Sequence, residues 1–323
     1  MKVSPLSERI KQIALEIGFS KAGITSAATF DTASDRLRSW IDSGMQGYMS
    51  YMERSQEKRR DPKAILPSAR SILSLALNYY HPEAHTEKLK ISRYAWGTDY
   101  HEIIPAMLEE LLKRIKAIEP ATEGKYYVDT GPVMEKAVAE RAGVGWIGKH
   151  SNVITRELGS WVFLSEIILN LELEPDTPAE DLCGTCTKCL DACPTNAIVE
   201  PYVVDARKCI SYLTIELKPE ESIPNELSDQ FENWLYGCDI CQDICPWNRF
   251  EQPSGDDRFA PRPANMDLEI PTVMGMTQED FSSRFRKSPV KRTKLAGLKR
   301  NAKALSVAKT AELHQNQPEI RDK

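Results

Sequence analysis

Hydrophobic residues recur along the first half of the chain with two different periods, which predict helices in some segments and strands in others. A helical period is carried near the N-terminus by Leu6, Ile10, Ile13 and Ile17. Residues 103–118 have the same period, whereas the apolar run at 70–80 and the run at 125–130 have the length and composition of strands. Residues 1–175 are therefore predicted to form a domain that mixes helices with strands.

Two further elements are expected towards the end of this domain. A helix should run from Pro132 to about Ala142, since proline is favoured in the first helical turn. Residues 151–173 contain two strand-like runs on either side of Glu157-Leu158-Gly159, a pattern that is typical of a hairpin. The domain should therefore end in a pair of adjacent antiparallel strands.

The composition changes twice along the rest of the chain. Residues 174–181 (EPDTPAED) and 252–263 (QPSGDDRFAPRP) are rich in residues that favour connecting segments. All eight cysteines lie between these two segments. We therefore expect an α+β protein with an N-terminal α/β domain at 1–175, a cysteine-rich domain at 176–250 and a C-terminal segment at 251–323.

The C-terminal segment is predicted to be basic and α-helical. Residues 281–311 contain no Asp or Glu, and their cations are Arg284, Arg286, Lys287, Lys291, Arg292, Lys294, Lys299, Arg300, Lys303 and Lys309. The whole chain has a formal net charge of −5, so contact with a nucleic acid would depend on this local patch. The alternative is a helix whose charged face is only solvated.

Neither a membrane span nor a secretory signal is expected. No run approaches 18 uninterrupted apolar residues, and residues 1–19 lack the apolar core of a signal peptide. A cytoplasmic location is therefore expected, and cysteines stay reduced there. Eight reduced cysteines are more readily explained as metal ligands than as disulfides.

The cysteine spacing is that of iron–sulfur proteins. Residues 183–194 (CGTCTKCLDACP) have the spacing C-x2-C-x2-C-x3-C-P of bacterial ferredoxins, in which the fourth cysteine ligates a second cluster. A second motif with the same ending lies at residues 238–246, and Cys209 supplies its missing ligand. A zinc site does not require the C-x3-C-P ending that both motifs have. The spacing therefore favours two 4Fe–4S clusters over zinc or disulfides.

The crossover of ligands in ferredoxins predicts which cysteines share a cluster. The first cluster is expected at Cys183, Cys186, Cys189 and Cys245. The second cluster is expected at Cys193, Cys209, Cys238 and Cys241. Two clusters indicate electron transfer but say nothing about the substrate.

Five longer segments carry a resemblance to a known family. They are RYAWGTDYH (93–101), YVDTGPVMEKAVAERAGVGWIGKHSNVI (127–154), EPYVVDARKCISYLTIE (200–216), YGCDICQDICPWNRF (236–250) and KRTKLAGLKRNA (291–302). Together with the double cysteine motif they closely resemble epoxyqueuosine reductases. The resemblance implies a cobalamin-dependent iron–sulfur oxidoreductase that converts epoxyqueuosine to queuosine at the wobble position of tRNA. It also implies a cobalamin domain similar to that of reductive dehalogenases, followed by a ferredoxin-like domain.

The resemblance further implies roles for single residues. Asp129 matches the family's proposed proton donor, and a partly desolvated carboxyl is expected to stay protonated near neutral pH. Taken alone, Asp129 is better explained by an Asx-turn or a helix cap, and only the resemblance favours the functional role. His101 has structural and functional interpretations of equal weight. Cobalamin contacts are expected from Arg54, Ser92, Asp129, Arg141, His150, Val153, Ser211 and Asp239. Contacts with tRNA are expected from Lys291, Arg292, Lys294, Lys299 and Arg300.

The expected partners are a tRNA that carries epoxyqueuosine in its anticodon loop and an external electron donor such as flavodoxin or ferredoxin. The chain is expected to act as a monomer, away from membranes. Three other functions are weighed against this one. They are a cobalamin-dependent reductase of another substrate, such as a halogenated compound, an electron carrier without a substrate of its own, and an RNA-binding module without redox chemistry.

Overall fold

A four-stranded antiparallel sheet forms the centre of the N-terminal half, with the strand order β1–β2–β7–β4. Its strands are β1 (Lys21–Ser26), β2 (Ser71–Asn78), β4 (Gly124–Tyr127) and β7 (Val162–Leu169). The computed structural model describes residues 5–85 and 88–315, with side chains as far as residue 307. β2 and β7 pair along their whole length and are almost entirely buried, so the sheet is covered on both faces.

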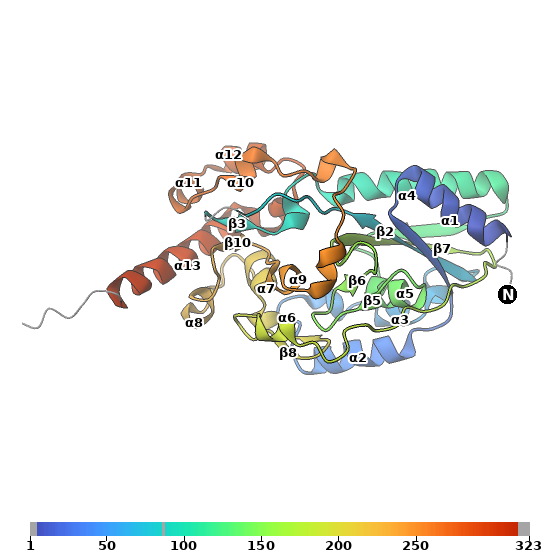
Figure 1. Cartoon of the computed structure of the whole chain (residues 1–323), viewed down its shortest axis with the longest axis horizontal. Coiled ribbons are helices and arrows are strands. Elements are labelled where there is room, and N and C mark those ends of the chain that lie inside the picture. Colours follow the sequence, from blue (N-terminus) through green and yellow to red (C-terminus); the bar gives the residue numbers. More distant parts are fainter. Residues whose placement is uncertain (1–4, 86–87, 316–323) are drawn as a thin grey trace, which may run out of the picture.

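Helices cover the two faces of this sheet (Figure 1). The helices of this half are α1 (Pro5–Ile17), α2 (Asp31–Asp42), α3 (Gln56–Arg60), α4 (Tyr100–Ile118) and α5 (Glu135–Arg141). The apolar stripes of α1 and α4 pack on the face that carries Leu73 and Leu75. On the other face, Ala139 and Ala142 of α5 lie against Ala76 of β2, and these small side chains allow α5 to approach the sheet closely. The loop before α5 is thereby fixed over the sheet.

A second hydrophobic core is built from three separate parts of the chain. It joins residues 89–96, residues 206–236 and residues 268–305. β3 (Lys90–Ile91) and β10 (Trp234–Tyr236) pair in parallel within it. The C-terminal segment is therefore packed on the cysteine-rich segment, and residues 89–96 share this core although they precede the predicted boundary at residue 175.

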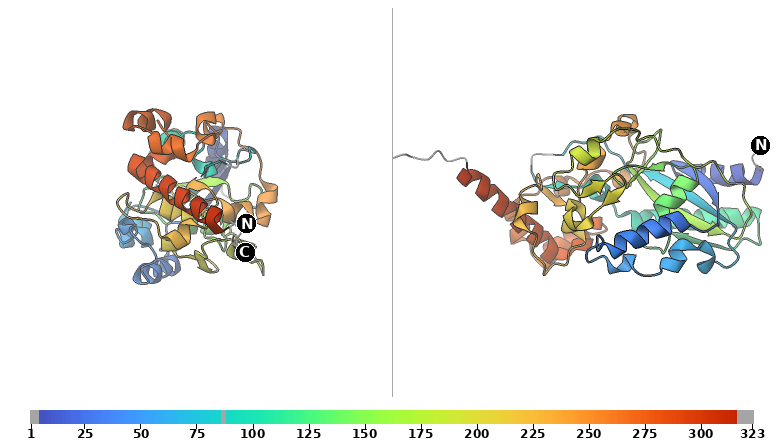
Figure 2. Two further views of the ribbon diagram at one scale, coloured as in Figure 1. Left: turned by 90° about the vertical axis from the view of Figure 1, so that its left-hand side faces the viewer. Right: turned by 90° about the horizontal axis from the view of Figure 1, so that it is seen from below.

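The remaining elements are short, apart from the last helix. The strands are β5 (Trp146–Ile147), β6 (Val153–Ile154), β8 (Ile198–Glu200) and β9 (Val203–Val204). The helices are α6 (Lys188–Asp191), α7 (Ile210–Ile215), α8 (Asn225–Ser228), α9 (Ile240–Asp243), α10 (Pro263–Met266), α11 (Ile270–Gly275), α12 (Gln278–Arg284) and α13 (Lys294–Gln315). Figure 2 shows α13 at the end of the molecule opposite α1 and α4. Within the described ranges, every helix is too short or too polar to cross a bilayer.

Most of the predicted elements are confirmed. α1, α4, β2 and β4 lie where the periodicity places them, and α12 and α13 make the C-terminal segment helical. Residues 174–181 lack regular structure, as expected of a connecting segment.

Two predictions about the end of the first domain are wrong in detail. α5 begins at Glu135 instead of Pro132, because Asp129 adopts a positive φ of 55° and its N–H donates to the Glu135 carboxylate, which keeps the intervening residues in a loop. The expected hairpin is also absent from residues 151–173, which are all described. β6 pairs with β5, whereas β7 lies between β2 and β4 because both of its faces are apolar.

Candidate active site and electron-transfer centre

Four cysteines from distant parts of the cysteine-rich segment line one cavity of about 120 Å³. They are the four cysteines predicted to share the first cluster, Cys183, Cys186, Cys189 and Cys245. Burial raises the pKa of the Cys189 thiol to about 11, and the neighbouring Cys183 and Cys245 thiols raise it further. Cys245 therefore lies with the first motif rather than with its own, as the ferredoxin crossover predicts.

The other four cysteines form a second group, whose members influence one another's charge. Burial raises the pKa of the Cys241 thiol, and the nearby Cys209 and Cys193 contribute to the same rise. Burial likewise raises the pKa of Cys238, with Cys241 as the next cause. Cys189 of the first group also influences Cys241, so the two groups are neighbours. The first predicted set thus lines one cavity and the members of the second lie within range of one another's charge, while the ligation of two clusters stays a prediction.

The loop that carries the first group is anchored by the segment between β5 and β6. The Lys149 ammonium donates to the carbonyl oxygens of Gly184 and Cys186 at 2.6 and 2.9 Å. His150 lines the same cavity, and burial lowers its pKa to about 4, so its ring is neutral. Among the described residues its Nε2 has no hydrogen-bond partner, while the buried Trp146 ring lies within reach of the Cys183 thiol. A sulfur atom of a cluster in the cavity would give Nε2 of His150 the acceptor that it lacks.

Asp129 lies at the other functional centre, in the loop between β4 and α5. Its Oδ2 accepts a hydrogen bond from the Tyr100 hydroxyl at 2.9 Å and lies 3.5 Å from Nε2 of His101. His101 is in turn held by Asp99, whose Oδ1 lies 2.9 Å from the ring Nδ1. The first turn of α4 therefore presents a hydroxyl and an imidazole to one carboxylate.

The charge of the Asp129 carboxyl differs from the charge expected from the sequence. Burial favours the neutral form of Asp129, but the hydrogen bonds from His101 and Tyr100 outweigh it, and the pKa of Asp129 is lowered. The same contact raises the pKa of His101 to about 9, with Asp129 as the largest cause and Asp99 as the next. The expectation that the Asp129 carboxyl itself stays protonated is wrong for this structure. The proton near neutral pH resides on His101, within reach of Asp129.

Two further carboxyls lie beneath the Asp129 loop. Glu135 accepts from the Asp129 N–H, and burial raises its pKa, with the charge of Asp129 as the next cause. Glu166 on β7 is fully buried, neither of its oxygens has a hydrogen-bond partner, and burial raises its pKa well above the ordinary value. The Ser74 hydroxyl, paired across the strands with Glu166, is also without a partner. These carboxyls are therefore held in the neutral form at moderate pH.

Lys136 connects the two centres. Burial lowers its pKa, and the charges of Glu135, Cys241, Asp129 and Cys209 act against that shift. Its ammonium donates to the Ser151 carbonyl at 2.6 Å. Lys136 is exposed, and the Asp129 side chain is 51% exposed. Burial is nevertheless the largest influence on the pKa of both side chains. Both side chains are therefore open to solvent on one side and surrounded by protein on the other.

The residues predicted to contact cobalamin are spread over several elements. Ser211 lies in the first turn of α7 beside Cys209, and its N–H donates to that thiol. The Ser92 hydroxyl donates to the buried Asp239 carboxylate, so these two bind each other. Arg54 is exposed before α3, and Val153 is buried against α5.

Arg141 has a clear structural task. Its guanidinium donates to the Thr25 hydroxyl and to the carbonyls of Ser26, Ala28 and Thr29. It also lies 3.5 Å from the centre of the Phe30 ring. Four of its five N–H groups are thereby used inside the protein, so it holds the connection from β1 to α2 and has little capacity left for a ligand.

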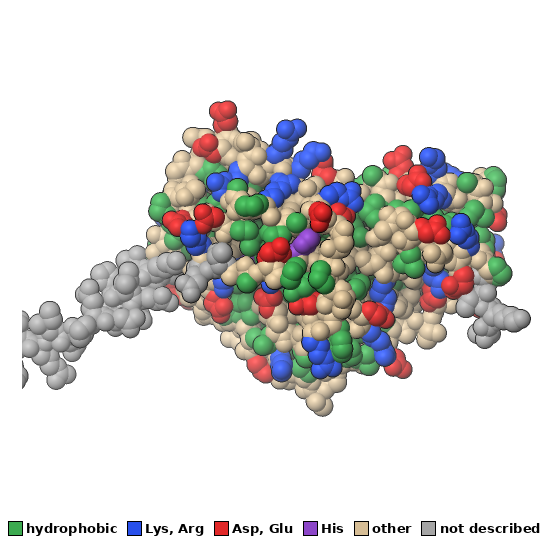
Figure 3. All heavy atoms as spheres, turned by 45° about the horizontal axis from the view of Figure 1, so that its top comes forward, with side chains coloured by type: hydrophobic (Ala, Val, Ile, Leu, Met, Phe, Trp, Pro, Cys, Tyr) green, Lys and Arg blue, Asp and Glu red, His purple; other side chains and the backbone are tan. Residues whose placement is uncertain are grey.

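The predicted tRNA-contacting residues divide into two groups. Lys291, Arg292 and Lys294 are exposed at the start of α13. The Arg300 guanidinium instead donates to main-chain carbonyls at Leu213, Leu217 and Lys218, and Lys299 is half-buried. On the face drawn in Figure 3, basic and acidic side chains are interspersed rather than segregated. The exposed cations are thus a local group, which we call the α13 patch (Lys291, Arg292 and Lys294).

This patch adjoins the Asp129 centre. Arg292 makes a two-pronged ion pair with Glu216 and lies 5.8 Å from the centre of the Tyr51 ring. Its charge contributes to the lowered pKa of Asp129, and Asp129 contributes to the raised pKa of Arg292. A polyanion held by the patch would therefore reach the proton-bearing group.

Sequence reasoning missed several residues of this centre. Tyr100, Glu135, Lys136 and Tyr51 were not singled out, although Tyr100, Glu135 and Lys136 lie inside the segments that carry the family resemblance. Glu166 gave a usable signal, since a lone acid in the apolar run from Trp161 to Leu169 must be buried or break the strand. Tyr51 lies in a loop whose position no periodicity reveals.

Comparisons with known proteins agree with this geometry. Residues 182–248 match the family model described as a 4Fe-4S double cluster binding domain, and residues 59–130 match the model described as epoxyqueuosine reductase QueG, DUF1730. An epoxyqueuosine reductase from Cellulophaga algicola is 47% identical over 296 residues, which is 91% of this chain and 96% of the relative.

Solved structures show the same likeness. A crystal structure of epoxyqueuosine reductase with an epoxyqueuosine-modified tRNA-Tyr stem loop superposes with a TM-score of 0.85 at 35% identity, covering 94% of this chain and 81% of that one. The enzyme from Bacillus subtilis, described with its catalytic aspartate loop swung out of the active site, superposes with a TM-score of 0.84 at 34% identity, covering 97% and 86%.

Proposed function

Because the chain belongs to the epoxyqueuosine reductase family, we propose that it reduces epoxyqueuosine to queuosine at the wobble position of tRNA. The overall change removes one oxygen, consumes two electrons and two protons, and releases water. One observation supports this function above the others: Asp129 lies 3.5 Å from the proton-bearing His101, and its charge is coupled both to Arg292 of the α13 patch and to Lys136, on which Cys209 and Cys241 also act. Electrons, protons and RNA would meet at that point.

Two kinds of cofactor would supply the redox chemistry. The 4Fe–4S clusters of the double-cluster domain deliver single electrons, and cobalamin, implied by the family resemblance, would supply a strongly nucleophilic metal centre. The polar side chains near Asp129 and Cys209 would suit a corrin ring, because Lys136, Asn152 and Ser211 can hydrogen-bond its amide side groups. The contacts predicted for Arg54, Ser92, His150, Val153 and Asp239 remain part of this proposal.

The protein's own residues would handle the protons. His101 carries a proton at neutral pH, and its Nε2 lies 3.5 Å from Asp129 Oδ2, which accepts a hydrogen bond from the Tyr100 hydroxyl. Asp129 would pass a proton from His101 to the oxygen of the opening epoxide. Asp129 would gain one proton and lose one proton, so the carboxylate would have the same charge before and after the transfer. A neutral Glu135 below the loop avoids a second negative charge beside Asp129.

The substrate would be held by charge and stacking. The α13 patch offers the exposed ammonium groups of Lys291 and Lys294 for phosphates, while Arg292 is held by Glu216. The half-exposed Tyr51 ring beside Arg292 offers a flat apolar face to an unpaired base. An anticodon loop presents both groups together. A cytoplasmic location, a monomeric state and an external electron donor complete the proposal.

Expression of the chain in a bacterial strain that accumulates epoxyqueuosine tests this function. Queuosine should replace epoxyqueuosine in digests of the total tRNA analysed by mass spectrometry. A variant in which Cys241 is replaced by serine should leave epoxyqueuosine unchanged, because the second cluster would lose one of its four ligands. Persistence of epoxyqueuosine in cells that make the wild-type, cluster-loaded protein would reject the proposal.

A further inference from the structure

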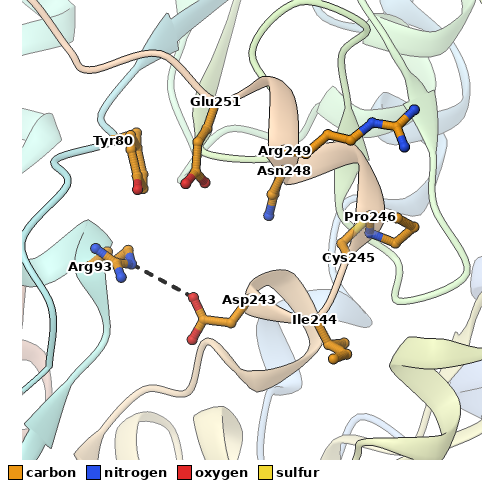
Figure 4. Close-up of a pocket in the computed structure, with 9 residues that line it drawn as sticks. All are labelled: Tyr80, Arg93, Asp243, Ile244, Cys245, Pro246, Asn248, Arg249 and Glu251. Carbon is orange, nitrogen blue, oxygen red and sulfur yellow. Dashed lines mark ion pairs between the residues drawn. The ribbon is translucent and has the colours of Figure 1, made fainter.

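A second hollow, of about 320 Å³, opens at the surface directly beside the first cysteine group (Figure 4). It is lined by residues of two regions, Tyr80 and Arg93 on one side and the turn after α9 on the other. Cys245 and Pro246 belong both to this hollow and to the cavity of the first cysteine group. A single stretch of chain therefore separates the surface hollow from the first cluster site.

The two cysteine groups differ in what surrounds them. Around the first group, Gly184, Thr185 and Thr187 are exposed, although Cys189 and Cys245 themselves are buried. The four cysteines of the second group are half-buried, and the charges of Cys209 and Cys241 act on Lys136. The first group borders the surface hollow and is called the outer group here, whereas the second lies towards Lys136.

The walls of the hollow are firmly built. The Arg93 guanidinium donates to the carbonyls of His81 and Glu83, lies 4.7 Å from the Trp96 ring centre and faces Asp243 at 3.8 Å. Figure 4 shows Tyr80, Arg93 and Asp243 pointing into the hollow, whereas the Arg249 side chain points away from it. The hollow is a preformed feature rather than a gap between loose side chains.

The rim has the character of a transient docking surface. Ile244 and Phe250 are 42% and 38% exposed, which is unusual for large apolar side chains in adjacent turns. The exposed Arg249 guanidinium lies 4.6 Å from the Phe250 ring centre. Two carboxylates also line the hollow, but Asp243 faces Arg93 and Glu251 accepts a hydrogen bond from Trp161 Nε1, so the exposed charge at the rim is the Arg249 cation. Such a rim suits a small acidic partner that binds briefly.

We propose that this hollow is where an external flavin-bearing redox protein of the flavodoxin type docks and delivers electrons to the outer cysteine group. The hollow is concave and would admit the projecting edge of a flavin ring. A carrier whose iron–sulfur cluster lies behind a flat surface would not fill the hollow. Each encounter passes one electron from the reduced flavin to the cluster held by Cys183, Cys186, Cys189 and Cys245. Two encounters supply the two electrons that one turnover consumes, while the two protons arrive separately.

This inference deepens the proposed function, but it is tested without tRNA. The reconstituted protein, loaded with its clusters, is mixed in a stopped-flow instrument with reduced flavodoxin, with reduced ferredoxin or with dithionite, and bleaching of the cluster absorbance is followed. Two variants, Arg249→Glu and Phe250→Ser, alter the rim without touching a cysteine. Arg36→Glu on the exposed side of α2 is the matched control.

Both rim variants should lower the second-order rate with flavodoxin by about tenfold, because charge steering and apolar contact are lost. Their rates with dithionite and their iron content should equal those of the wild type, and Arg36→Glu should change nothing. Wild-type rates with flavodoxin in both variants would overturn the proposal, as would equal slowing with dithionite. Slowing with ferredoxin alone would overturn the flavin assignment. Conversion of epoxyqueuosine driven by dithionite should persist in the variants, which separates this proposal from the proposed function.

Discussion

The side chain of Asp129 is the point at which the protein's charges converge. His101, Tyr100 and Arg292 all stabilise its negative form, although burial alone would favour the neutral one. A carboxylate in this setting acts best as a proton relay, since it gains a proton only when His101 gives one up. The predictions at this scale concern Asp129 and its partner.

Replacement of Asp129 by asparagine should abolish the relay and preserve the hydrogen bond from Tyr100. Turnover of epoxyqueuosine-containing tRNA should fall by a factor of about 100 or more, which is typical for loss of a proton-transfer group. Iron content and cobalamin binding, measured by absorbance, should be unchanged. Asp35→Asn on the exposed side of α2 is the control. Full activity of the Asp129→Asn variant would remove Asp129 from the reaction.

The pKa of His101 predicts how activity depends on pH. The folded-state value of about 9 lies above the ordinary value of 6.5, so His101 keeps its proton through the neutral range and loses it as the pH rises through about 9. The value of kcat/KM should therefore decline above about pH 9. His101→Gln should lower kcat/KM by about tenfold or more at neutral pH and remove this decline. A decline that is unchanged in the variant would assign the titration to another group.

At the scale of elements, α5 and β7 enclose a pair of coupled buried carboxyls. Glu166 has no hydrogen-bond partner among the described residues, and Glu135 is the titratable group that acts on it. In the unfolded chain glutamate releases its proton near its ordinary pKa, whereas Glu166 keeps its proton in the folded chain. The folded state therefore binds more protons, and its stability falls as the pH rises above about 4.5.

Glu166→Gln should weaken this dependence. Between pH 5 and pH 8 the wild-type protein should lose stability with a slope of up to about 1.4 kcal/mol per pH unit for this one proton. The variant should show a shallower slope and a higher melting temperature at pH 8, measured anaerobically by circular dichroism. Glu172→Gln provides the control, because Glu172 is exposed and pairs only with Arg70. Parallel pH profiles for wild type and Glu166→Gln would show that Glu166 is already ionised in the folded state.

At the scale of the whole molecule, three chain segments meet at one place. The start of α4, the loop before α5 and the start of α13 are far apart in sequence, yet their charged groups influence one another. The α13 patch should therefore contribute to tRNA binding as well as to the electrostatics of Asp129.

Reversal of two charges in the α13 patch tests this connection. Lys291→Glu combined with Lys294→Glu should weaken binding of a tRNA anticodon stem loop and lower the salt dependence of log Kd by about one to two units of slope. Iron content should be unaffected, and Lys113→Glu on α4 should bind RNA as the wild type does. Equal slopes for the double variant and the wild type, measured by fluorescence anisotropy over a salt series, would place the RNA elsewhere.

The sequence predicted the local elements and the cysteine groups well, because both depend on short-range spacing. The C-x2-C-x2-C-x3-C-P pattern is sufficient to pair Cys245 with the first motif, and the cavity it shares with Cys183 agrees with that pairing. The resemblance supplied Asp129, for which spacing alone offers a turn or a helix cap.

The remaining features depend on contacts between distant segments. No period in the sequence shows that Arg292 lies near Tyr51, that Arg300 is consumed by main-chain carbonyls, or that residues 89–96 join the C-terminal core. The ionisation of Asp129 was wrongly predicted for the same reason. Its sign is decided by His101 and Tyr100, which reach it from another helix.

The most direct test of the proposed function uses purified components. Protein reconstituted anaerobically with iron, sulfide and cobalamin is mixed with an excess of reductant and a limiting amount of tRNA that contains epoxyqueuosine, and the modified nucleoside is analysed by mass spectrometry. We predict complete conversion to queuosine with loss of one oxygen atom, and no conversion without reductant. Unchanged epoxyqueuosine after reaction with fully loaded, reduced protein would contradict the proposed function.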